Sequence, residues 1–258
     1  MIQQIVRVES NREVAEGIHL LRFQSASIAE KARPGQFLNV RAPERWGSLL
    51  LRRPFSISRI VGTAVELVYN IVGGGTKVLA TQREGDLLDV LGPLGIHFDY
   101  ESPFETAVLV AGGLGVAPFP FLTDSLETRK VGIITFFGSR TKFNFESLHL
   151  RNVEYATDDG SNGFKGTVVE CLAEYLRTHK PVNVKIFGCG PTKMLFALST
   201  FAQAAKLRCE LSLEGDMACG IGICQGCPVE KKNGPKKYAL VCTEGPTFDC
   251  QDIVLPQS

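Results

Sequence analysis

The sequence lacks the features that mark a nucleic-acid-binding or exported protein. Its 28 basic and 27 acidic side chains nearly cancel, so no strongly charged surface is available for nucleic acid or an anionic membrane. Residues 1–11 interleave polar residues with Ile and Val, which predicts a strand and not an export signal. Internal repeats and low-complexity tracts are also missing from the chain.

A hydrophobic run able to span a membrane is missing as well. The uncharged stretch 106–123 is long enough to raise the question, but three glycines and two prolines interrupt it. We predict a buried strand followed by a loop in this stretch, and no membrane span.

Cysteine, in contrast, is abundant, and four of the eight cysteines lie close together near the C-terminus. Cys219, Cys224, Cys227 and Cys242 are spaced C-x4-C-x2-C-x14-C, and the first three repeat the opening of a plant-type [2Fe-2S] ligand set. Glycines between them let backbone N–H groups approach the sulfides without an intervening Cβ. Structural zinc also takes four thiolates, but zinc ribbons usually present two C-x2-4-C pairs. The spacing therefore favours a [2Fe-2S] cluster over zinc.

The other four cysteines, Cys171, Cys189, Cys209 and Cys250, have no ligand spacing, and we predict that they are buried. Eight cysteines without a signal peptide indicate a reducing compartment, where thiols serve metals more often than disulfides. We therefore expect a cytoplasmic protein.

The hydrophobic pattern changes twice along the chain, which predicts three domains. Residues 1–101 contain short alternating segments between Pro and Gly turns, typical of a small antiparallel barrel; they are 18–23, 36–40, 55–60 and 64–71. Residues 102–205 alternate apolar strands with helical stretches, typical of a parallel sheet covered on both faces; the strands are 107–111, 132–137 and 184–187, and the helices 167–177 and 192–205. Residues 206–258 are too short for an apolar core of their own, so we expect their fold to depend on the metal.

Two motifs in the first domain predict a flavin site. Arg53-Pro54-Phe55-Ser56 begins a strand and matches the R-x-Y/F-S motif of the ferredoxin reductase superfamily. This resemblance implies that Arg53 pairs with a flavin phosphate, Phe55 packs on the isoalloxazine and Ser56 lies near N5. Phe55 replaces the more usual tyrosine, so a tyrosine hydroxyl bond is absent.

The second motif, Gly73-Gly74-Gly75-Thr76, precedes a predicted short helix at 77–82. Glycine-rich backbone that enters a helix N-terminus is suited to phosphate, although a triple glycine can also be only a flexible turn. The order and separation of the two motifs support a flavin site that includes Gly75 and Thr76. By the same resemblance, Tyr69, Asn70 and Ile71 run their backbone along the flavin.

The second domain contains two loops that predict a nicotinamide site. Gly112, Gly113 and Gly115 belong to a G-G-x-G-x-A-P loop after the first apolar strand, where a glycine turn exposes backbone N–H groups to a pyrophosphate. Gly188-Cys189-Gly190-Pro191 matches the second nicotinamide loop of ferredoxin reductase-like proteins. Cys189 is either a buried structural residue or a neighbour of the nicotinamide ring. Ser139-Arg140 leaves the choice between NAD and NADP open.

Taken together, the motifs place nicotinamide, flavin and cluster sites in one chain, and flavin links two-electron to one-electron transfer. From the barrel through Cys242-Thr243-Glu244-Gly245-Pro246, the sequence resembles the electron-transfer subunits of class B dihydroorotate dehydrogenases. The resemblance implies an FMN-containing catalytic subunit as partner, a heterotetramer of two plus two, and electrons that pass through [2Fe-2S] and FAD to NAD⁺ in pyrimidine (UMP) biosynthesis. It also implies a fold of a flavin-binding antiparallel β-barrel, a parallel-sheet α/β nicotinamide domain and a small C-terminal [2Fe-2S] domain.

Two alternatives stay open at the level of sequence. The same electron path would serve a reductase subunit of another complex, such as a ferredoxin:NADP oxidoreductase, a sulfide dehydrogenase or a hydrogenase. A zinc-stabilised dinucleotide-binding sensor is the alternative from another class. Glu214 and Asp216 precede Cys219 closely, which places them either near a cofactor or in a solvated turn.

Overall fold

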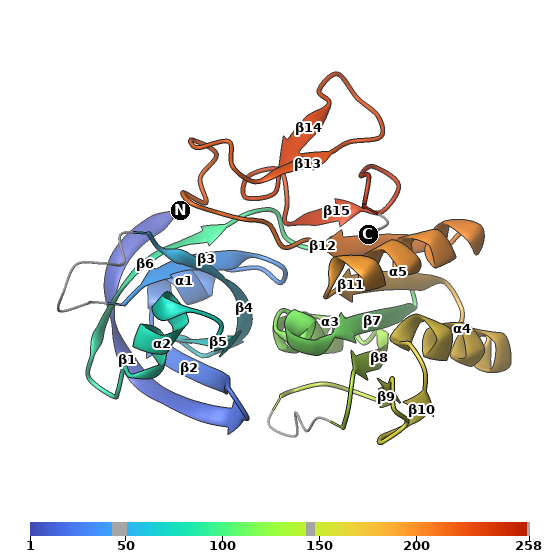
Figure 1. The fold of residues 1–258 in the computed structure, drawn as a ribbon, viewed down its shortest axis with the longest axis horizontal. Coiled ribbons are helices and arrows are strands. Elements are labelled where there is room, and N and C mark those ends of the chain that lie inside the picture. Colours follow the sequence, from blue (N-terminus) through green and yellow to red (C-terminus); the bar gives the residue numbers. More distant parts are fainter. Residues whose placement is uncertain (43–50, 143–147, 257–258) are drawn as a thin grey trace.

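A computed structural model describes residues 1–42, 51–142 and 148–256. Figure 1 shows a barrel beside a helix-flanked sheet, with a small hairpin above the junction between them. The predicted barrel and the predicted parallel sheet are both present. The C-terminal segment adds strands to the sheet and forms the small hairpin.

The barrel is closed and antiparallel, as predicted, with strand order β1-β2-β5-β4-β3-β6. Its strands are β1 Ile2–Ala15, β2 Ile18–Gln24, β3 Phe37–Arg41, β4 Arg53–Val61, β5 Ala64–Asn70 and β6 Leu87–Leu94, and its helices are α1 Ala26–Lys31 and α2 Gly74–Ala80. Alternate residues such as Phe23, Ile57 and Leu67 are fully buried inside it. Each such side chain contributes about 1.5–3 kcal/mol by leaving water.

Helix α2 begins earlier than the sequence pattern predicted, at Gly74 instead of Lys77, and ends at Ala80 instead of Gln82. The reason is the side chain of Thr76, whose Oγ1 accepts the N–H groups of Val72 at 3.0 Å and Gly73 at 3.1 Å. These bonds satisfy donors that a helix start otherwise leaves free, so the chain turns into the helix within the glycine run.

The second part is a seven-stranded sheet with order β10-β9-β8-β7-β11-β12-β15. Its strands are β7 Thr106–Gly112, β8 Gly132–Ser139, β9 Val153–Thr157, β10 Phe164–Lys165, β11 Val184–Cys189, β12 Arg208–Ser212 and β15 Thr247–Asp249. All neighbours are parallel except β12 and β15.

Helices cover both faces of this sheet, which confirms the predicted architecture. Val108 and Val110 of β7 pack with α4 Val168–His179 and α5 Thr192–Ala204, whereas Leu109 packs on the other face with α3 Phe119–Thr128. Successive side chains of a strand point to opposite faces, so an apolar run such as β7 needs cover on both.

For residues 106–123, the predicted strand is confirmed, but the predicted loop after it is wrong. A short 3-10 turn, η1 Gly113–Val116, leads into α3, which begins at Phe119. Pro118 and Pro120 occupy the cap and first turn of α3, where a missing N–H costs no helical hydrogen bond. Within the described ranges, none of the helices is long and apolar enough to cross a membrane.

The C-terminal segment depends on more than a metal. Its strands β12 and β15 pair into the sheet, and Leu211, Val241 and Ile253 share the core under α4 and α5. A separate hairpin, β13 Pro228–Glu230 and β14 Tyr238–Leu240, carries an exposed, lysine-rich turn. The segment therefore also leans on the sheet, while its dependence on the metal and the domain boundaries near 101 and 205 stay predictions.

The buried side chain of Lys185 links the sheet to the segment that connects the barrel with it. Lys185 on β11 places its Nζ 2.8 Å from Asp99 Oδ2 and 2.8 Å from Glu210 Oε1. Asp99 lies in the connection between β6 and β7, and Glu210 lies on β12. The ion pairs therefore fasten the connecting segment to two strands of the sheet.

Candidate functional site

A cavity of about 360 Å³ opens between the barrel and the sheet. Its lining comes from Phe37 of β3, from β4, from β5 with the turn into α2, from the loop after β7, from the end of β11, from residues at and after the end of β12, and from Pro246 before β15. The predicted site residues among them are Arg53, Pro54, Phe55, Ser56, Tyr69, Asn70, Thr76 and Cys189. The cavity has the volume and the mixture of apolar and polar lining that small-molecule sites use.

The flavin motif on β4 faces this cavity beside β5. The ring of Phe55 meets the ring of Tyr69 edge-on, with centroids 5.6 Å apart. Tyr69 is buried in the barrel, its hydroxyl donates to Asn11 Oδ1 at 3.0 Å, and burial raises its pKa to about 12. Its hydroxyl is thus engaged inside the barrel, and both Tyr69 and Asn70 line the cavity. Ile71 is not among the lining residues.

The glycine motif contacts the arginine of the flavin motif. A Cβ on Gly75 would overlap the guanidinium of Arg53, so only glycine allows this close approach. Helix α2 has only seven residues, so its dipole would attract a phosphate group weakly. The positive charge that would attract a phosphate here is that of Arg53. Backbone of the glycine run and Arg53 together could hold a phosphate group at this edge of the cavity.

The two predicted nicotinamide loops pack against each other. Cys189 and Ala111 are neighbours across the parallel strands β11 and β7, so both loops leave the same edge of the sheet. A Cβ on Gly115 would overlap the backbone carbonyl of Cys189, and a Cβ on Gly112 would overlap Pro191. Gly190 has φ +153°, a value that glycine adopts readily. Crevices at the carboxyl ends of parallel strands are where α/β proteins bind nucleotides.

Cys189 lies in the cavity wall and is 3% exposed. Burial, with a smaller effect from nearby Glu214, raises its pKa to about 12, so the residue is a neutral thiol. Cys189 is thus buried and also lies in the wall of the cavity that the flavin motif lines, so its position beside a nicotinamide ring stays a prediction. Gly113 has open space around it, which suits the approach of a ligand to its backbone.

The sequence interpretation missed most of one cavity wall, which is made by residues 212–215 and 217 at and just after the end of β12. Glu214 belongs to this wall; its carboxylate reaches solvent, yet the surrounding protein raises its pKa by desolvation. The available signal was position, because these residues follow a strand end of the parallel sheet. The exposed Asp216 does not line this cavity.

Beyond this wall the chain reaches the four clustered cysteines, whose thiols form two pairs. Cys219 Sγ accepts the N–H groups of Cys224 at 3.4 Å and Ile221 at 3.5 Å. Cys227 Sγ accepts the N–H of Cys242 at 3.4 Å. Desolvation raises the pKa of Cys219, but the backbone hydrogen bonds outweigh it and lower the value to about 7. Burial and Cys227 raise the pKa of Cys242 to about 11.

The paired arrangement fits a two-iron cluster better than a single zinc ion. Zinc with Zn–S bonds of about 2.3 Å holds four sulfurs about 3.8 Å apart. In the described ranges, no three of these sulfurs lie within 4.8 Å of one another. Each pair of thiols could hold one iron of a [2Fe-2S] cluster, which takes four thiolates in two pairs.

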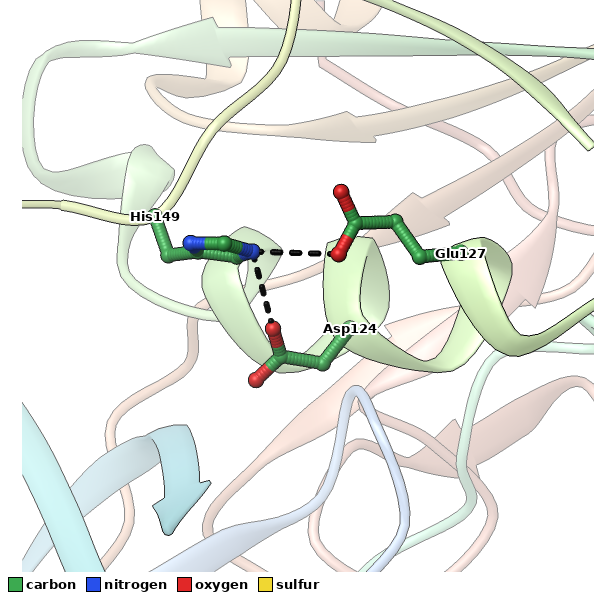
Figure 2. A group of neighbouring side chains, drawn as sticks. All are labelled: Asp124, Glu127 and His149. Carbon is green, nitrogen blue, oxygen red and sulfur yellow. Dashed lines mark hydrogen bonds and ion pairs between the residues drawn. The ribbon is translucent and has the colours of Figure 1, made fainter. Parts of the chain in front are cut away.

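A second group with metal-ligand chemistry, outside the cavity lining, joins Asp124 and Glu127 of α3 to His149 in the connection between β8 and β9. Figure 2 shows His149 Nε2 between Asp124 Oδ1 and Glu127 Oε2, at 3.1 Å from each. Arg59 on β4 binds Asp124 at 2.8 Å, and Arg151 binds Glu127 at 2.5 Å. The arginines already neutralise both carboxylates, so we interpret the group as an ion-pair network that joins barrel and sheet.

Comparison with known proteins agrees with this geometry. Residues 214–254 match the family model of the iron-sulfur cluster binding domain of dihydroorotate dehydrogenase B. The electron transfer subunit of dihydroorotate dehydrogenase B (NAD(+)) from Enterococcus faecalis V583 is 36% identical, with 98% of each chain covered. The corresponding subunit from Desulforamulus reducens is 36% identical over 93% of this chain and 94% of its own. The chain belongs to this family of electron transfer subunits.

Solved structures of related proteins share the fold of this chain. The NADH-dependent reduced ferredoxin-NADP oxidoreductase matches with a TM-score of 0.83 and 26% identity, covering 98% of this chain and 90% of its own. The ferredoxin reductase of carbazole 1,9a-dioxygenase, at 18% identity and a TM-score of 0.67, shares the fold. The predicted family, fold class, electron-transfer function and cofactor set of FAD, [2Fe-2S] and NAD are confirmed at the level of the family.

Proposed function

We propose that this chain carries electrons from the FMN of a dihydroorotate dehydrogenase catalytic subunit to NAD⁺, in pyrimidine (UMP) biosynthesis. The cluster ligands are Cys219, Cys224, Cys227 and Cys242, and FAD occupies the cavity between barrel and sheet. The complex is a heterotetramer of two subunits of each kind. One observation carries the proposal: the flavin motif, Cys189 and the stretch that leads to Cys219 all line a single cavity.

Bound FAD supplies the exchange between two-electron transfer with a nicotinamide and one-electron transfer with a cluster. The residues of this chain bind, orient and shield it. Arg53 binds a phosphate, and Phe55, Val68 and Leu213 give the cavity an apolar lining that limits water. The neutral thiol of Cys189 adds no charge beside the nicotinamide.

The end of β8 supports NAD over NADP as the coenzyme. The backbone N–H groups of Asp158 and Asp159 donate to the carbonyls of Ser139 and Arg140, at 3.2 and 3.3 Å. Two carboxylate residues therefore lie beside Arg140, the candidate partner of a 2′-phosphate. Carboxylates repel that phosphate and accept hydrogen bonds from a ribose hydroxyl.

The first test is an electron paramagnetic resonance spectrum of the anaerobically purified chain after addition of NADH. We expect stoichiometric FAD, two irons per chain, and the signal of a reduced [2Fe-2S] cluster. Zinc in place of iron, together with no flavin, would refute the electron-transfer proposal and favour the dinucleotide-binding sensor.

The second test concerns the partner. Mixing the chain with an FMN-containing dihydroorotate dehydrogenase subunit should give dihydroorotate-driven reduction of NAD⁺ and a two-plus-two mass by native mass spectrometry. A mixture that neither assembles nor turns over would refute the assignment of the partner.

A second candidate is a reductase subunit of another complex, which the similarity to the ferredoxin-NADP oxidoreductase structure favours. The hydrogenase and sulfide dehydrogenase alternatives predict the same internal electron path. Reduced ferredoxin as the sole effective electron donor, with dihydroorotate and its catalytic subunit inactive, would select this candidate.

A further inference from the structure

One buried side chain connects the barrel to the cluster segment. Asn39 lies on β3 and is 1% exposed, and its Nδ2 donates to the backbone carbonyl of Cys219 at 3.0 Å. The two residues are 180 positions apart in the chain. A side chain of the flavin barrel is therefore hydrogen-bonded to the backbone of a predicted cluster ligand.

The same strand belongs to the flavin site. Asn39 pairs with Pro54, and Phe37 pairs with Ser56, in the register between β3 and β4. Phe37 lines the cavity together with the flavin motif. Asn39 thus lies on the strand that pairs with the flavin motif, two residues from the cavity-lining Phe37, and its side chain contacts the cysteine loop.

The cysteine loop is shaped to receive this side chain. Gly220 has φ +70°, and a Cβ at this position would overlap Nδ2 of Asn39. Glycine at 220 is therefore needed both for its backbone conformation and for the close approach of the amide. The next residue, Ile221, is one of the two N–H donors to Cys219 Sγ.

The side-chain amide of Asn39 lowers the folding stability of the barrel. Its Oδ1 is buried and has no hydrogen-bond partner among the described residues. A buried oxygen without a partner costs about 1–3 kcal/mol, whereas an apolar side chain of the same shape would avoid this cost. Stability of the barrel alone does not explain the amide, but its bond to Cys219 does.

We propose that Asn39 is a positioning residue, which holds the Cys219–Gly220 peptide against the flavin-binding strands. It thereby fixes the separation between the cluster ligand and the flavin cavity, and it orients the N–H donors that face Cys219 Sγ. Hydrogen bonds to cluster sulfurs and solvent access both tune the reduction potential of iron-sulfur sites. The inference rests on the proposed function of the cavity and the four cysteines.

The test replaces Asn39 by leucine in the full-length chain loaded with FAD and iron. Gln225→Asn is the matched control, because the Gln225 amide also donates to a carbonyl of this loop, Gly222 O at 2.5 Å, but is exposed. Asparagine tolerates the positive φ of residue 225, +57°, and is too short to make the bond. The readouts are the cluster's paramagnetic resonance spectrum, its midpoint potential, and stopped-flow rates of FAD and cluster reduction by NADH.

We expect Asn39→Leu to bind FAD and to have its FAD reduced by NADH at the normal rate. Its cluster should show a changed spectrum and potential, and its reduction should slow by about tenfold, which corresponds to the loss of one hydrogen bond that keeps the loop in place. Gln225→Asn should match the unmodified chain in all four readouts.

An unchanged spectrum, potential and cluster reduction rate in Asn39→Leu would overturn the inference. If leucine prevents cluster loading, Asn39→Ser provides a smaller side chain that is also too short to reach Cys219. Loss of FAD and of cooperative unfolding in both variants would identify Asn39 as a packing residue and overturn the inference. Failure of the proposed function is distinct, because the unmodified chain would then show no cluster signal.

Discussion

Replacement of Lys185 by methionine should destabilise the protein more than any surface substitution. The side chain of Lys185 is 4% exposed, and its Nζ contacts Asp99 Oδ2 and Glu210 Oε1, each at 2.8 Å, and the Asp99 carbonyl at 2.5 Å. Its ammonium group also lies over the rings of Phe104 and Phe187, with Nζ 5.8 and 5.4 Å from the ring centroids. Methionine retains the packing volume but removes the charge.

The magnitude follows from the exposure of the two carboxylates that remain. Breaking a buried ion pair by removing one partner costs about 3–5 kcal/mol. The Asp99 side chain is 54% exposed and stays solvated, whereas that of Glu210 is 14% exposed and, among the described residues, keeps only the N–H of Asp99, at 2.8 Å. We therefore expect a loss of about 3 kcal/mol, near the lower limit of that range.

The assay is urea unfolding of the cofactor-loaded chain, followed by circular dichroism and flavin absorbance, since bound cofactors can separate the two transitions. Lys185→Met/Glu210→Gln should recover at least half of the loss, because no buried charge then lacks a partner. Arg177→Ala is the control; its pair with Glu174 is 72% and 51% exposed and is worth less than about 0.5 kcal/mol. A loss below about 1 kcal/mol for Lys185→Met, or no recovery in the double variant, would refute this account.

Four further substitutions test the sites and the pH dependence. Gly115→Ala should separate the two nucleotide loops by overlap with the Cys189 carbonyl, which slows FAD reduction by NADH about 10- to 100-fold in stopped-flow measurements. Arg53→Ala should weaken FAD binding about 10- to 100-fold in fluorescence titrations, because one or two charge-assisted hydrogen bonds are lost. Cys224→Ser should abolish the cluster signal and dihydroorotate-driven reduction of NAD⁺ while FAD reduction by NADH persists. Although desolvation raises the pKa of Asp99, hydrogen bonds from Lys185 and Ser102 lower it to about 2, against 3.8 when unperturbed. Ionised Asp99 therefore stabilises the fold above pH 4 and loses this effect as the pH falls toward 2, so Asp99→Asn should remove about 1 kcal/mol of acid-dependent stability, after allowance for solvent exposure.

For each of these four substitutions, one result would contradict the prediction. Normal NADH kinetics in Gly115→Ala would show that the loops need not touch, and normal FAD affinity in Arg53→Ala would place the phosphate elsewhere. Arg53→Lys is the matched control, since it keeps the charge but loses the bidentate geometry. Retention of the full electron path in Cys224→Ser would exclude Cys224 as a ligand. Parallel unfolding curves of Asp99→Asn and the unmodified chain between pH 4 and 2 would contradict the assignment to Asp99.

The sequence was sufficient to predict what depends on local pattern. Alternation of apolar residues predicted the barrel, continuous apolar strands predicted the doubly covered sheet, and the spacing of Cys219, Cys224 and Cys227 predicted the cluster segment. The prolines at 118 and 120 were interpreted as breaks because a loop and the first turn of a helix tolerate proline equally well. The outcome there depended on the packing of α3 between β4 and the sheet, which no local pattern encodes.

Contacts between distant segments account for what the sequence interpretation missed. The cavity wall at residues 212–215 and 217 exists because β12 joins the sheet beside β11. The Asn39 contact requires a barrel strand and a loop 180 residues later to meet. Single-sequence patterns report which face of an element is apolar, but not which distant backbone group that face will meet.

Because β12 pairs with β11, the cluster segment cannot be removed as a detachable module. A chain cut before residue 206 would leave β11 as an exposed edge strand with unpaired N–H and C=O groups, a template for aggregation. We therefore expect a chain truncated before residue 206 to aggregate, and the ligand segment should be expressed together with the nicotinamide sheet.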